Sequence, residues 1–172
     1  MLQAVQIFMN KSIPKSKTVL GISLGTRYTG VAVFRHGELI EYQTKVFNGK
    51  ITKKKLKRIL NSLEKQIAYY TVDSIAMKIP EGEARSKEIR QIILDIEKIA
   101  KDKKLQFFRY TISDLKQTCF PDEKANRQDL AEYLMQKYPE LSFVEKCGLN
   151  RHTYYGKMFE AVAAGMQHCI KP

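Results

Sequence analysis

The fold of this chain is decided by one stretch, Val19-Leu-Gly-Ile-Ser-Leu-Gly-Thr-Arg-Tyr-Thr-Gly-Val-Ala-Val33. Short apolar runs lie at both of its ends, and a glycine-containing turn separates them. Runs of this kind, bounded by glycine, are typical of strands in the middle of a covered sheet. We therefore predict two buried strands, the first of which ends near Ser23. The turn presents backbone N–H groups, Thr26 and Arg27, a set that suits a phosphate.

The remaining elements follow from changes in hydrophobic period. His36-Gly37 predicts a hairpin turn into a third strand. Beyond it, the apolar spacing predicts strands at 38–46, 74–79 and 106–111, helices at about 52–70, 84–101, 126–138 and 154–169, and a polar connection at 140–153.

The order of these elements predicts an α/β fold. The first three strands form an antiparallel meander, and the two later strands each follow a helix, which is typical of parallel addition to a sheet. We expect a mixed five-stranded sheet with helices on both faces. Residues 1–17 are expected to form a loosely attached arm, and residues 18–172 a single domain.

The net charge is +12, and the positive charge is concentrated in one segment. Between Lys45 and Lys65 there are eight basic residues against one acid, Glu64, so this segment carries +7. Such clusters neutralise phosphates, although a solvated helix face that aids solubility would look the same. The predicted nucleic-acid contacts are Thr26, Arg27, Lys50, Lys53, Lys54, Lys55, Lys57 and Arg58.

Other features place the chain in a reducing compartment. Its three cysteines match neither a disulfide framework nor a zinc-binding spacing. No apolar run approaches the roughly 18 residues of a membrane span, and the start lacks the pattern of a signal peptide. We expect a cytoplasmic protein without a membrane partner.

Three blocks together resemble the ribonuclease-H-like superfamily, in the branch of RuvC-type Holliday-junction resolvases and YqgF-type relatives. The segment 21–33 is similar to the first-strand signature G-I-D-x-G-[ST]-x-x-T-G-x-A. Residues 75–79 fall where the family's fourth strand ends in a catalytic glutamate. The segment 157–168 is similar to the last-helix signature D-x-x-D-A-x-A-x-A-x-x-H. The resemblance covers nearly the whole chain and implies the ribonuclease-H-like fold.

The departures from the family pattern bear on function. The family's nucleases use clustered carboxylates to hold two divalent cations for phosphodiester cleavage. The resemblance places Ser23, Lys78, Lys157 and Glu160 on those acid positions. The family set would carry −4, whereas this set carries a net +1, because Glu160 alone is acidic. We therefore expect no metal and no cofactor at these positions.

Each of these residues also has a structural interpretation. Ser23 fits a crowded strand end, and Lys157 lies three residues before Glu160, as in an intrahelical ion pair. Lys78 must either reach solvent or pair with an acid such as Glu160, because an unpaired buried lysine is costly. Glu81 and Glu83 are candidate substitute ligands, but loop charges facing water are the simpler interpretation. His168 is interpreted as a capping or surface histidine.

Three functions are compatible with these residues. The first is a catalytically degenerate resolvase-like protein that binds DNA or RNA through a basic face. The second is a structure-specific endonuclease with reassigned ligands, which would need Mg²⁺ or Mn²⁺. The third is a protein-interaction scaffold without enzymatic activity. A homodimer is left open in each case.

Overall fold

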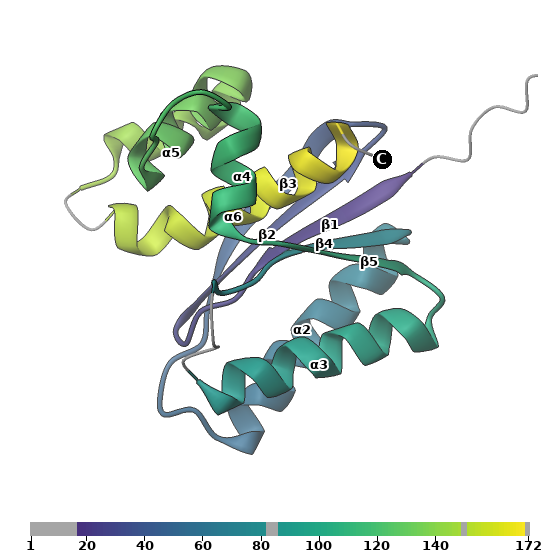
Figure 1. The fold of residues 1–172 in the computed structure, drawn as a ribbon. Coiled ribbons are helices and arrows are strands. Elements are labelled where there is room, and N and C mark those ends of the chain that lie inside the picture. Colours follow the sequence, from purple (N-terminus) through teal and green to yellow (C-terminus); the bar gives the residue numbers. More distant parts are fainter. Residues whose placement is uncertain (1–16, 82–85, 149–150, 171–172) are drawn as a thin grey trace, which may run out of the picture.

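Five strands form the sheet at the centre of the molecule, in the order β3-β2-β1-β4-β5 (Figure 1). The computed structural model describes residues 17–81, 86–148 and 151–170, so all but Lys17 of the expected N-terminal arm lies outside the described residues. β1 pairs with β2 and β2 with β3 in antiparallel fashion, whereas β4 and β5 are parallel to β1. The predicted mixed sheet is confirmed. Its strands are β1 (Thr18–Ser23), β2 (Tyr28–Arg35), β3 (Glu38–Val46), β4 (Ser74–Lys78) and β5 (Gln106–Tyr110).

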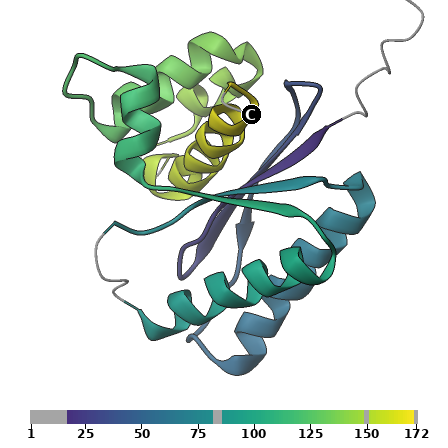
Figure 2. The ribbon, with the colours of Figure 1, turned by 45° about the vertical axis from the view of Figure 1, so that its right-hand side comes forward.

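Helices cover both faces of the sheet, as predicted (Figures 1 and 2). One layer consists of α2 (Lys53–Tyr70) and α3 (Lys87–Asp102). The other consists of α4 (Ile112–Cys119), α5 (Arg127–Lys137), the 3₁₀ helix η1 (Pro139–Lys146) and α6 (Arg151–Ile170). No helix in the described part of the chain is both long and apolar enough to cross a bilayer.

Strand β1 divides its side chains between the two layers. Leu20 and Ile22 pack in the core beneath α2 and α3, and Val19 packs in the core beneath α4, α5 and α6. Because side chains alternate along a strand, Ser23 points to the same side as Val19. The alternation in the sequence therefore decides that Ser23 faces α6.

One predicted connection was wrong. Residues 140–153 were expected to be a polar link, but they contain most of η1 and the first residues of α6. Pro139 occupies the start of η1, where its missing N–H costs nothing, and Leu141 and Val144 are buried. These two apolar residues supply the packing that orders the segment.

Candidate functional site

Two polar side chains end neighbouring strands on one face of the sheet. Ser23 is the last residue of β1, Lys78 is the last residue of β4, and the parallel register pairs them directly. Ser23 is fully buried, and the side chain of Lys78 is 8% exposed. A lysine so far from water needs a counter-charge nearby.

Helix α6 supplies that counter-charge because it lies very close to the sheet. Gly21 of β1 faces the backbone carbonyl of Ala161, and Gly30 of β2 faces that of Lys157. A Cβ atom at either glycine would overlap the carbonyl oxygen opposite it. This close approach brings the turn of α6 that carries Lys157 and Glu160 to the ends of β1 and β4.

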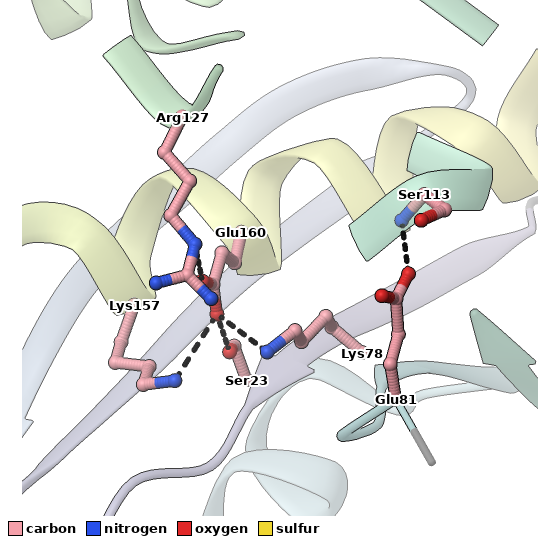
Figure 3. A network of polar contacts seen from close by, with 7 residues as sticks. All are labelled: Ser23, Lys78, Glu81, Ser113, Arg127, Lys157 and Glu160. Carbon is pink, nitrogen blue, oxygen red and sulfur yellow. Dashed lines mark hydrogen bonds and ion pairs between the residues drawn. The ribbon is translucent and has the colours of Figure 1, made fainter. Parts of the chain in front are cut away.

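The carboxylate of Glu160 is the centre of a polar network (Figure 3). Its Oε2 accepts a hydrogen bond from the Ser23 hydroxyl at 2.5 Å. The same oxygen lies 3.4 Å from Nζ of Lys78 and 3.3 Å from Nζ of Lys157. Nε of Arg127, at the start of α5, lies 3.6 Å from Oε1. One buried carboxylate therefore faces three cationic side chains.

These charges shift the pKa of Glu160. Burial acts to raise the pKa of this carboxyl, but Lys157, Lys78, the Ser23 hydroxyl and Arg127 together outweigh burial and hold the pKa below its ordinary value. Glu160 is thus a carboxylate at neutral pH. Neighbouring positive charge stabilises the ionised form of an acid.

The pKa of Lys78 is lowered, chiefly by burial. The attraction of Glu160 raises the pKa of this lysine, whereas the charges of Lys157 and Arg127 lower it further. The pKa of Lys78 stays below its ordinary value because burial, together with these two like charges, outweighs the attraction of Glu160. With Glu160, the cluster of Lys78, Arg127 and Lys157 carries a net charge of +2.

The structure brings together all four residues that the sequence placed on the family's acid positions. It adds Arg127, which the sequence analysis missed. Arg127 follows the N-cap Asn126 at the first position of α5, and no local pattern links that position to the strand ends. Its partner Glu160 lies in another helix, so the packing of α5 against α6 makes the contact.

The residues at this centre do not fit a pair of divalent cations. Mg²⁺ and Mn²⁺ prefer several anionic oxygen ligands, and here the oxygens of Glu160 are engaged by the Ser23 hydroxyl and three cations. Among the described residues, no cluster of three or more acidic, histidine or cysteine side chains could hold a metal ion. Two ammonium groups and a guanidinium would also repel a cation.

Glu81, one of the two candidate substitute ligands, does not reach the centre. Glu81 is exposed and accepts a hydrogen bond from the backbone N–H of Ser113 at 2.8 Å, on the far side of Lys78 in Figure 3. Hydrogen bonding to the side chain and the backbone of Ser113 lowers the pKa of Glu81. Glu83 lies outside the described residues.

The predicted phosphate-binding turn lies beside the centre. Thr26 lines a hollow of about 400 Å³ together with Lys78, Arg127 and Lys157. The Arg27 guanidinium lies 5.3 Å from the centre of the Tyr28 ring. Thr26 and Arg27 are both exposed.

The predicted lysine cluster lies apart from the centre, on the other layer of helices. Lys50, Lys53, Lys54, Lys57 and Arg58 are exposed, and we call these five the α2 basic surface. Lys55 does not belong to it. Its side chain is buried, 5% exposed, and Nζ donates to the carbonyl of Gly49 at 2.9 Å.

The interpretation of His168 as a capping or surface residue is wrong. It is 1% exposed, and its ring lies 4.2 Å from that of Phe108 on β5. Neither ring nitrogen hydrogen-bonds to the part of the protein that the structure describes. Burial lowers the pKa of this imidazole, which is therefore neutral at pH 7. The contact with Phe108 of β5 thus places the His168 ring in the interior of the protein.

No protein-family model and no curated protein matches the chain's sequence. Solved structures do match its fold. RuvC of T. thermophilus in complex with a Holliday junction substrate has a TM-score of 0.69 at 14% identity, covering 90% of this chain and 94% of that one. A second Thermus thermophilus RuvC structure gives 0.65 at 13% identity, covering 88% and 92%. Fowlpox virus resolvase in complex with Holliday junction DNA gives 0.59 at 13% identity, covering 90% and 99%. These likenesses extend over nearly the whole chain, which therefore has the ribonuclease-H-like fold in its RuvC-type form.

Proposed function

We propose that the chain is a catalytically degenerate, resolvase-like protein that binds nucleic acid through a basic face. The α2 basic surface carries this proposal. None of its five cations forms an ion pair with another described residue, so their charge is free to act on a ligand. The solved relatives in complex with Holliday junctions make branched DNA the first ligand to test.

The position of these lysines favours binding over mere solubility. Lys53 and Lys54 lie in the first turn of α2, which contains no acidic residue. Positive charge at a helix N-terminus opposes the helix dipole and costs about 0.3–1 kcal/mol per residue. A lysine that only aids solubility could lie anywhere on the helix surface. A phosphate bound near the first turn of α2 would offset the unfavourable interaction with the helix dipole. Figures 1 and 2 show this end of α2 at the same end of the sheet as the turn between β1 and β2.

The loss of nuclease chemistry is supported by the site. A two-metal mechanism needs clustered carboxylates that are free to bind the ions. Glu160 is instead held by Ser23, Lys78, Lys157 and Arg127. The fixed cations occupy the neighbourhood in which metal ions would otherwise neutralise charge.

The first prediction concerns the salt dependence of binding. Affinity for a four-way junction, a duplex and a single strand should fall steeply with salt. The variant Lys53→Gln/Lys54→Gln/Lys57→Gln should make the slope of log K against log salt shallower by about 2 to 3, because each lost phosphate contact removes about 0.9 on B-DNA. Fluorescence anisotropy across a salt series measures the slope.

Two controls make this result specific. Lys98→Gln/Lys101→Gln/Lys103→Gln removes the same charge from exposed positions near the C-terminal end of α3, at the opposite end of the sheet, and should leave the slope unchanged. Lys55→Gln lies within the same basic run but is buried, and it should also leave the slope unchanged. An equal effect of the α2 and α3 triple variants would contradict the proposed face, and no binding at low salt would favour a protein-interaction scaffold.

The second prediction is that the protein cuts none of these substrates. Incubation with Mg²⁺ or Mn²⁺ should yield no product on a denaturing gel, because the centre lacks free carboxylates. Junction cleavage that requires either ion would establish an endonuclease with reassigned ligands and remove the degenerate assignment.

A further inference from the structure

Among the described residues at the ends of β1 and β4, positive charge exceeds negative charge. Lys78, Lys157 and Arg127 share Glu160, and no other described acid forms an ion pair with them. The side chains of Lys78 and Glu160 are 8% and 6% exposed and neutralise each other, so the excess positive charge lies on Lys157 and Arg127, which reach solvent. Three cations that share one carboxylate leave a local excess of positive charge, which attracts an anion.

Space for such an anion lies directly at the cluster. One hollow, of about 440 Å³, lies between α5 and α6 and is lined by Arg127, Lys157 and Glu160. The hollow of about 400 Å³ described above shares Arg127 and Lys157 and has Lys78 in its wall. These volumes fall within the range of sites that bind small molecules.

The cations have donors to spare for a ligand. A lysine ammonium has three N–H donors and an arginine guanidinium has five, and Glu160 accepts few of them. The side chains of Lys157 and Arg127 are 27% and 70% exposed, so an anion can approach from solvent. Arginine and lysine donors of this kind bind phosphate oxygens strongly.

The geometry points to a metal-independent phosphate site formed by Lys78, Arg127 and Lys157 in place of a catalytic centre. A phosphate monoester, with up to two negative charges, would balance the excess of +2, and a phosphodiester, with one, would reduce it to +1. Glu160 orients the three cations and limits their charge. The site is separate from the α2 basic surface. Binding of a nucleic-acid phosphate at this site, unlike binding of a free phosphate ester, rests on the function proposed above.

The test uses inorganic phosphate as the probe. Isothermal titration at constant ionic strength, with EDTA present, should show saturable binding to the full chain. Arg127→Gln/Lys157→Gln should weaken it by about tenfold or more, because each hydrogen bond to a charged group contributes appreciably. The control Arg90→Gln/Lys98→Gln removes two exposed charges on α3 and should bind phosphate normally. Circular dichroism checks that each variant is folded.

Competition separates the two sources of phosphate. Displacement of the probe by a nucleoside 5′-monophosphate would assign free phosphate esters, and displacement by an oligonucleotide without terminal phosphates would assign the nucleic-acid backbone. The inference is overturned by the absence of saturable binding, by a requirement for divalent metal, by displacement with neither competitor, or by equal loss in the control. Failure here with the salt-dependent nucleic-acid binding intact would leave the proposed function standing. Saturable phosphate binding without salt-dependent nucleic-acid binding would overturn the proposed function alone.

Discussion

Gly30→Ala is expected to abolish stable folding. A Cβ atom at this position would overlap the backbone carbonyl of Lys157, and neither β2 nor α6 can move without disturbing the core that both pack into. The expected loss is more than about 4 kcal/mol, a large part of the 5–15 kcal/mol that usually stabilises a domain. Urea denaturation followed by circular dichroism measures it.

Gly156→Ala is the matched control for this prediction. Gly156 also belongs to α6, but a Cβ atom there would meet nothing within 4 Å. Alanine in a helix is favoured over glycine by about 0.5–1 kcal/mol, so this variant should be as stable as the parent or slightly more stable. Similar stability of the two alanine variants would show that α6 does not lie against β2 as described.

The second large effect is expected from Glu160→Gln. This change leaves Lys78 buried beside Lys157 and Arg127 without a negative partner. Removing one partner of a buried ion pair costs about 3–5 kcal/mol. The expected result is a fall of that size in the free energy of unfolding at pH 7, whereas Glu123→Gln, at an exposed acid, should have little effect.

A second substitution tests the cause of that loss. In Lys78→Met/Glu160→Gln the unpaired buried charge is gone, so the double variant should be more stable than Glu160→Gln alone. A double variant no more stable than the single one would mean that Lys78 does not depend on Glu160.

The lowered pKa of Glu160 predicts that the stability of the protein depends on pH. The pKa of Glu160 is lower in the folded protein than in the unfolded chain. Its contribution to stability is therefore complete above the unfolded value of about 4.3 and is lost as the pH falls through the folded value. The difference in stability between the parent and Glu160→Gln should be constant from about pH 5 to 7 and should narrow below about pH 4. A difference that widens in acid would contradict the ion pairs.

Much of the fold could be predicted from the sequence because it depends on local patterns. The glycine-bounded apolar runs at 19–33 defined two buried strands, and the spacing of apolar residues defined most helices. The region at 140–153 was missed because its few apolar residues, among them Leu141 and Val144, show no clear period. Their burial depends on helices distant in sequence.

The candidate site, like the fold, could be predicted from the sequence only in its local features. The sequence by itself determined that Ser23 ends a strand, that Lys78 lies near the end of another, and that Lys157 and Glu160 share one turn of a helix. These are properties of neighbouring residues. The tertiary structure alone decided that the four meet, that Arg127 joins them, and that Lys55 and His168 are buried. Strand register and the close approach of α6 at Gly21 and Gly30 set these distances, and both arise from contacts between segments far apart in the chain.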